Sequence, residues 1–143
     1  MGTRADFFIG IGPNAEWIGS TSYDGDPSGW GRKPLSARTE ALFRNAIEEM
    51  LSDHEALVTR PSEGWPWPWP DFRTSDYAYA WDPARNSAVV SRGYTWVTPS
   101  QMAADPDCLC SGSPLRDDEV PDMRKVPKGD ILGKSGLMFL REG

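Results

Sequence analysis

The stretch Asp76-Tyr77-Ala78-Tyr79-Ala80-Trp81-Asp82 alternates strictly between large aromatic and small side chains. A period of two is typical of a β-strand, because successive side chains on a strand point to opposite faces of the sheet. Tyr77, Tyr79 and Trp81 are therefore expected to share one face. This pattern predicts a strand over residues 76–82.

Two β-hairpins are predicted around such strands. Residues 83–86 supply turn chemistry, and residues 87–92 form a plausible antiparallel return strand, with a continuation through Tyr94 and Trp96. Nearer the start of the chain, residues 6–11 read as a buried strand, and a Gly-Pro-Asn turn leads into a return strand over residues 15–21.

One helix is predicted between the two hairpins. Residues 24–34 are rich in glycine and proline and read as a loop, after which Ser36 is a suitable N-cap. A helix over residues 37–53 then places apolar side chains on one face at helical spacing: Leu42, Phe43, Ala46, Ile47, Met50 and Leu51. We expect this helix to lie across the sheet.

The sequence therefore predicts a single α+β domain over residues 1–143, with two antiparallel hairpins in one sheet and one helix packed on it. Residues 1–97 form the ββαββ core. Residues 98–143 are predicted to be a loop-rich extension, because they lack periodicity and separate their acidic and basic side chains. Its apolar pieces at 131–132 and 137–140 could pair as closing strands.

Between the helix and the alternating strand lies Gly64-Trp65-Pro66-Trp67-Pro68-Trp69-Pro70. Proline fixes its own φ and pushes the preceding residue toward extended conformations, so this run is predicted to be a stiff rod. Two interpretations remain open. The rod either folds back over the sheet and fills the core beside Tyr77 and Trp81, or presents its indoles as a recognition surface.

Charge and composition exclude several classes of protein. The net charge is −6, with 21 acidic against 15 basic residues, which disfavours nucleic-acid binding and is compatible with a basic partner. The chain contains neither a secretory signal pattern nor an apolar run long enough to span a membrane. We expect a cytoplasmic protein with reduced thiols.

Motifs for catalysis and metal binding are weak. The one histidine, His54, is expected at the end of the helix, and no nucleophile motif accompanies it. The carboxylates Asp71, Asp76 and Asp82 flank the aromatic region and could in principle act as an acid–base pair in a small hydrolase. No catalytic residue is assigned, and the sequence favours a non-enzymatic protein without a cofactor.

Two stretches carry partial metal-binding patterns. Residues 24–29 have oxygen donors at the spacing of a calcium loop, but Leu35 occupies the position that requires a glutamate. Cys108 and Cys110 are two soft ligands, whereas a closed zinc site requires four. The simpler interpretations are a turn and two incidental thiols, so no metal site is predicted.

The aromatic and basic residues of the middle region remain as the candidate binding site: Trp65, Trp67, Trp69, Phe72, Arg73, Tyr77, Tyr79, Trp81 and Arg92. The leading hypothesis is a small acidic binding protein that uses this surface, helped by the acidic residues 105–122, to engage a protein partner with a basic surface. The alternative is a small-molecule pocket for a nucleotide or sugar, walled by Trp65, Trp69, Tyr79 and Trp81, with Arg73 or Arg92 as the anion anchor.

Motifs in three stretches carry a family resemblance. Residues 2–10, residues 15–20 and the residues from Gly64 to Ala80 resemble a family of small uncharacterised proteins of bacteria and phages, through the GTRADFF-IG and GWPWPW…DYAYA patterns. The resemblance covers about the first two thirds of the chain and supplies no catalytic residues. It implies a phage or mobile-element setting, in which such a protein could inhibit a host defence factor.

Overall fold

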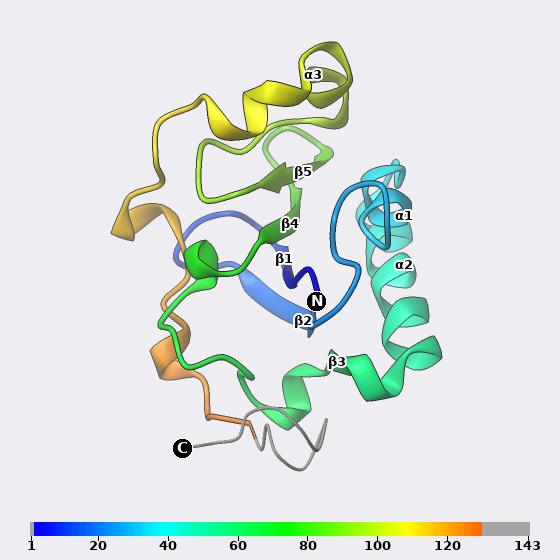
Figure 1. Ribbon diagram of the computed structural model, residues 1–143, viewed down its shortest axis with the longest axis vertical. Helices are drawn as coiled ribbons and strands as arrows, with labels where there is room; N and C mark the ends of the chain where they lie inside the picture. The colour runs from blue at the N-terminus through cyan, green and yellow to red at the C-terminus, as the bar shows by residue number, and fades with distance from the viewer. Residues whose placement is uncertain (1, 130–143) are drawn as a thin grey trace.

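The computed structural model describes residues 2–129, which fold around one mixed β-sheet (Figure 1). Within these residues the sheet has five strands, and their spatial order is β3 (Val58–Thr59), β2 (Glu16–Thr21), β1 (Ala5–Ile9), β4 (Tyr77–Asp82) and β5 (Ser87–Ser91). The α+β class and the loop-rich C-terminal part are thus confirmed.

Both predicted hairpins form, and a parallel pairing joins them. β1 pairs antiparallel with β2, and β4 pairs antiparallel with β5. β1 and β4 lie side by side and run parallel, with Ala5 opposite Tyr77. Parallel neighbours require a long crossover connection, which here carries β2, the helices between residues 32 and 53, the short strand β3 and the tryptophan–proline run. Neither the parallel pairing nor β3 was predicted.

The main helix, α2 (Glu40–Asp53), begins three residues later than predicted. Its N-cap is Thr39, whose side chain accepts a hydrogen bond from the backbone N–H of Leu42. Ser36 instead ends a preceding short helix, α1 (Arg32–Leu35), which lies in the region predicted to be loop. A third helix, α3 (Pro99–Ala104), belongs to the C-terminal extension.

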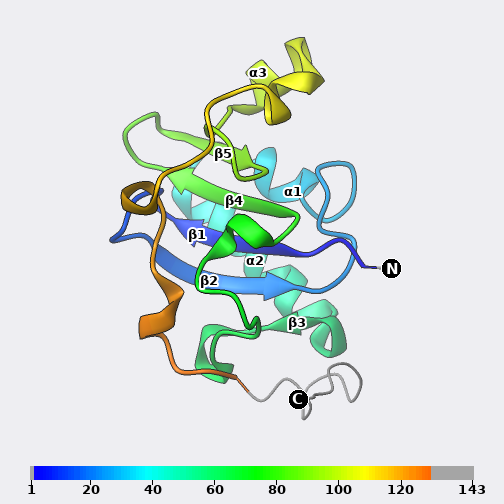
Figure 2. The same ribbon diagram turned by 60° about the vertical axis from the view of Figure 1, so that its left-hand side comes forward.

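α1 and α2 cover one face of the sheet, which we call the helix face (Figure 2). Tyr79 and Trp81 of β4 pack there, together with Phe7 of β1 and with Phe43 and Ile47 of α2. Phe7 and Tyr79 stack with their ring centroids 5.4 Å apart. The predicted shared face of the alternating strand is therefore confirmed.

The opposite face of the sheet, which we call the rod face, is covered without an α-helix. Its core contains two tryptophans of the run and side chains from both ends of the described chain: Phe8, Trp17, Trp65, Trp67, Phe72, Ala78, Ala80, Val89, Trp96, Leu115, Val120 and Met123. Of the two interpretations of the rod, its return over the sheet is the one observed. It packs against the face opposite Tyr79 and Trp81.

A C-terminal segment, residues 113–129, crosses the outside of the rod (Figure 2). Backbone bonds hold it there: the Trp65 N–H donates to Pro127 O over 2.9 Å, and the Met123 N–H donates to Pro70 O over 2.7 Å. Short 3-10 turns at Asp117–Glu119 and Met123–Lys125 give it local shape. The closing strands predicted at 131–132 and 137–140 lie outside the described residues.

The second hairpin ends earlier than predicted. β5 stops at Ser91, and the chain reverses at Gly93, whose φ of +96° is readily adopted only by glycine. The returning segment pairs Val97 with Val90, so Trp96 does not extend the strand. Among residues 2–129, no helix has the length and apolar character needed to cross a membrane.

Candidate functional site

Most of the predicted binding residues lie in the core. Five of them are almost fully buried: Trp65, Trp67, Phe72, Tyr79 and Trp81. Trp69, Arg73 and Tyr77 are partly buried, and Arg92 is exposed. A partner that approaches the folded chain can therefore touch only the second group.

The small-molecule pocket predicted from the aromatic residues is not formed. Tyr79 and Trp81 belong to the helix face, whereas Trp65 belongs to the rod face, so the sheet separates them. The predicted anion anchor Arg73 is already engaged, since it donates to Asp71, to Leu115 O and to Asp117. The other, Arg92, lies over the ring of Tyr77, 4.9 Å from its centroid.

Sequence analysis overlooked Asp6, a fully buried carboxylate that holds the rod to the sheet. Its Oδ1 accepts hydrogen bonds from Trp67 Nε1 at 2.7 Å and from Ser20 Oγ at 2.5 Å, and its Oδ2 accepts from Ser75 Oγ at 2.6 Å. Burial raises the pKa of Asp6 to about 6, against the lowering effect of these hydrogen bonds. This group organises the core and does not face solvent.

The three carboxylates predicted as a hydrolytic set are each paired with a different arginine. Asp71 pairs with Arg73 at 2.6 Å, Asp76 with Arg4 at 3.5 Å and Asp82 with Arg85 at 2.8 Å. Asp76 and Asp82 flank opposite ends of β4, which separates them by about 20 Å at roughly 3.3 Å per residue. A glycosidase pair requires a separation of about 5–10 Å, so these two cannot act together.

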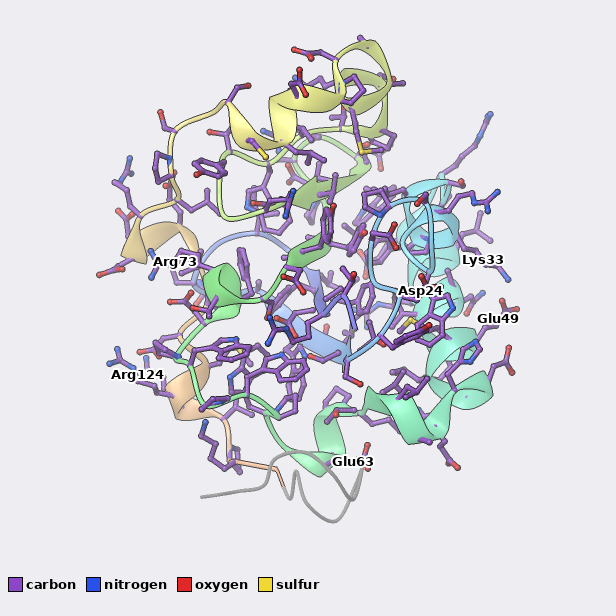
Figure 3. The ribbon with its side chains drawn as sticks, in the orientation of Figure 1. Asp24, Lys33, Glu49, Glu63, Arg73 and Arg124 are labelled. Atoms are coloured by element: carbon purple, nitrogen blue, oxygen red, sulfur yellow. The ribbon has the colours of Figure 1, made fainter. Side chains whose placement is uncertain are left out.

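The pKa of Asp71 shows the effect of its arginine. Burial alone would raise this pKa, but hydrogen bonds from the Arg73 guanidinium and backbone N–H hold it below the usual value. Asp71 is thus a structural anion beside the C-terminal segment. Figure 3 shows Arg73 and Arg124 on the side of the molecule opposite Lys33 and Glu49.

Neither stretch with a partial metal motif gathers a set of ligand side chains among the described residues. In the loop at residues 24–29, backbone N–H groups bond within the turn, including Gly29 to Asp26 O and Trp30 to Asp24 O. Cys108 and Cys110 are both free thiols. Among the residues that the structure describes, no three His, Cys, Asp or Glu side chains gather as metal ligands.

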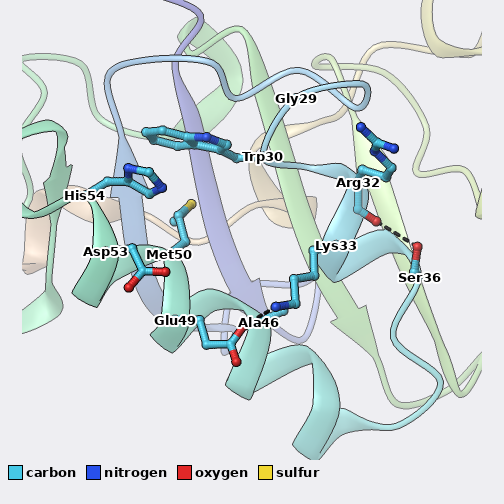
Figure 4. A pocket seen from close by; sticks show the side chains of 10 residues that line it. All are labelled: Gly29, Trp30, Arg32, Lys33, Ser36, Ala46, Glu49, Met50, Asp53 and His54. Atoms are coloured by element: carbon cyan, nitrogen blue, oxygen red, sulfur yellow. Dashed lines mark hydrogen bonds and ion pairs between the residues drawn. The ribbon is translucent and has the colours of Figure 1, made fainter.

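The helix side of the molecule contains a pocket of about 430 Å³ between α1 and α2. Figure 4 shows α2 as its floor and Trp30 across its top. The lining residues are Gly29, Trp30, Arg32, Lys33, Ser36, Ala46, Glu49, Met50, Asp53 and His54. Its volume falls in the range of about 300–1,000 Å³ that is usual for small-ligand sites.

Aromatic rings form one wall of this α1–α2 pocket. Trp30 and His54 stack with their ring centroids 4.1 Å apart, and Tyr23 meets Trp30 edge-on at 6.2 Å. Unlike the buried tryptophans of the rod face, Trp30 is only partly buried, and Tyr23 is 49% exposed. Stacking on His54 holds the indole in place beside the pocket.

Charged groups border the pocket on both sides. Lys33 of α1 reaches over Ala46 and bonds to Glu49 of α2, so these two charges are paired (Figures 3 and 4). Among residues 2–129, the Arg32 guanidinium and the Asp53 carboxylate each lack a hydrogen-bond or ion-pair partner. The pocket thus has an unpaired cation on the α1 side and an unpaired anion at the end of α2.

Sequence reasoning missed this pocket because its two walls come from separate predictions, the loop at residues 24–34 and the helix at residues 37–53. Trp30 lay in a stretch interpreted as loop, Arg32 and Lys33 in the helix that was not predicted, and His54 at a helix end. A tryptophan inside a glycine-rich loop was the one available signal, since such loops seldom provide enough neighbours to bury an indole.

Comparison of the chain with protein-family models, curated protein sequences and solved structures gives no match. The fold and the α1–α2 pocket therefore rest on the geometry of this chain alone. The resemblance to small bacterial and phage proteins stays a prediction.

Proposed function

We propose that this protein binds a small molecule with a planar ring and an anionic group in the α1–α2 pocket. The observation that carries the proposal is Trp30, a partly exposed indole fixed by stacking on His54 at the wall of a cavity of about 430 Å³. An aromatic face of this kind favours a flat ring or a cation. The pocket replaces the one expected around Trp65 and Tyr79.

Charge on the α1 side supports an anionic group on the ligand. The Arg32 guanidinium offers a planar set of donors suited to phosphate or carboxylate. No acidic side chain among the described residues forms an ion pair with it. Lys33 lies beside it but is paired with Glu49. We therefore assign Arg32 as the anion anchor, the role expected for Arg73 or Arg92 from the sequence.

Isothermal titration of the full chain with mononucleotides, sugar phosphates and aromatic carboxylates tests the proposal. We expect at least one class to bind with saturation, and Trp30→Leu and Arg32→Gln to weaken that binding about tenfold or more each. Tyr94→Leu and Arg38→Gln are matched controls away from the lining and should leave it unchanged. Absence of binding across the panel, or binding insensitive to Trp30 and Arg32, would overturn the proposal.

A second candidate, the protein partner with a basic surface, is favoured by the acidic extension. Its carboxylates Asp105, Asp107, Asp117 and Asp118 are exposed, and Trp69 remains partly accessible beside Arg4. The partner would then be a host factor with a basic surface, which this protein would inhibit in a mobile-element setting. Pull-down from a bacterial lysate should then retain a protein on the wild type and lose it on an Asp107→Asn, Asp118→Asn double variant; equal retention on both would count against it.

A further inference from the structure

We propose that the ligand of the α1–α2 pocket is a guanine nucleotide, with its base edge on Asp53 and its phosphate on Arg32. This inference rests on the proposed function and specifies its ligand. Arg32 and Asp53, which both lack a partner among residues 2–129, stand on opposite sides of the pocket, with Trp30 along the wall (Figure 4). A nucleotide has the matching order, because its planar base lies at one end and its anion at the other.

Asp53 determines which base fits. An ionised carboxylate only accepts hydrogen bonds, and its two oxygens can accept two parallel ones. Guanine presents two adjacent donors, N1–H and the N2 amino group, on its Watson–Crick edge. Adenine and cytosine place a ring-nitrogen acceptor beside their amino group, and uracil flanks its single N–H with two carbonyl oxygens. Among the common bases, guanine therefore complements Asp53 best.

The surrounding residues agree with a purine. One face of Trp30 stacks on His54, and the part of the indole that stays exposed offers a flat surface on which a base can stack. Met50 lies buried beneath the pocket and supplies an adaptable apolar floor. Ser36, whose hydroxyl donates to Arg32 O, holds the backbone of the residue that carries the anion anchor.

Asp53 can be altered without disturbing the fold. It is exposed at the last position of α2, where a negative charge interacts unfavourably with the negative end of the helix dipole. Asp53→Asn therefore should not destabilise the helix. It replaces one of the two acceptor oxygens with an amide that repels the donors of guanine. Glu55→Gln, an exposed acidic position just beyond α2, is the matched control.

Titration of the full chain with GMP, IMP and AMP tests this inference. Hydrogen bonds to a charged acceptor contribute about 1.5–3 kcal/mol, so GMP should bind roughly tenfold or more tightly than AMP. IMP, which lacks only the N2 amino group, should fall between them. Asp53→Asn should remove most of the preference for GMP, whereas Glu55→Gln should keep it.

The outcomes separate this inference from the proposed function. If GMP and AMP bind equally and both depend on Trp30 and Arg32, the pocket binds nucleotides but the guanine assignment is wrong. If GMP preference survives Asp53→Asn, the assignment of Asp53 is wrong. If none of the three binds but another member of the panel does, the nucleotide class is overturned and the pocket function stands.

Discussion

The two faces of the sheet are covered in different ways. α2 covers the helix face with apolar side chains at helical spacing, and its backbone hydrogen bonds are satisfied within the helix. The rod face is covered by proline-rich chain and by residues 113–129, whose polar groups need partners elsewhere. A helix therefore needs only an apolar face at helical spacing in order to pack on the sheet. A segment without regular secondary structure also needs specific hydrogen bonds to groups such as Asp6.

The largest expected effect is on the rod face. Trp67→Ala removes a buried indole and one of the donors to Asp6, so we expect the free energy of unfolding to fall by about 3–5 kcal/mol. Trp69→Ala, at the neighbouring partly exposed position, should cost only about 1–2 kcal/mol. Urea denaturation measures both. Equal losses would mean that the rod is not held by burial.

The next effect is a pH dependence that originates in Asp6. Its pKa is raised from 3.8 to about 6 in the folded protein, so the folded state keeps this proton to higher pH than the unfolded chain does. The free energy of unfolding should then fall as pH rises from about 4 to about 6, by about 3 kcal/mol from this group. Below pH 4 both states are protonated and the loss vanishes.

Asp6→Asn isolates this contribution. The amide can still accept from Trp67 and Ser20 and can donate to Ser75, but it does not titrate. The variant should therefore lose most of the fall between pH 4 and 6, as measured by urea denaturation across that range. The same slope in both proteins would show that Asp6 is ionised in the core or that its site is hydrated.

Arg73 tests how the C-terminal segment is attached. It links Asp71 to Asp117 and to Leu115 O, across more than 40 positions in sequence. Arg73→Gln should lower the free energy of unfolding by about 1–3 kcal/mol and speed amide exchange in residues 113–129. Arg124→Gln, which breaks only a local exposed pair with Asp122, is the control and should leave that exchange unchanged.

The sequence predicted the elements that follow a period and missed those that depend on distant partners. Strand alternation and helical spacing located β1, β2, β4, β5 and α2 to within a few residues. The parallel pairing of β1 with β4 arises from a crossover over the sheet, and no local pattern encodes it. The rod was ambiguous for the same reason, since a Trp-Pro repeat fits burial and exposure equally well.

The candidate site was harder to predict than the fold. Its aromatic wall joins Trp30 to His54 across 24 positions, and Arg32, the proposed anion anchor, lies in a helix of four residues, α1. Abundance of aromatic residues pointed instead to the rod, where hydrogen bonding to Asp6 and covering by residues 113–129 remove them from solvent. A high density of aromatic residues indicated burial, whereas a single tryptophan in a loop, Trp30, marked the pocket that we propose as the binding site.

The smallest effect concerns the start of α2, where sequence and structure disagree. Ser36 was predicted as the N-cap, but Thr39 accepts the hydrogen bond from Leu42, and the Ser36 hydroxyl donates to Arg32 O. Thr39→Ala should therefore lower the free energy of unfolding by about 1 kcal/mol, because it leaves a helix N–H without its acceptor. Ser36→Ala should change it by less than about 0.5 kcal/mol, since the site is exposed. The reverse order in thermal or urea denaturation would indicate that Ser36 is the N-cap and that α2 starts at residue 37. The connection between α1 and α2 would then be too short for α1 to stand beside α2 as a wall of the pocket.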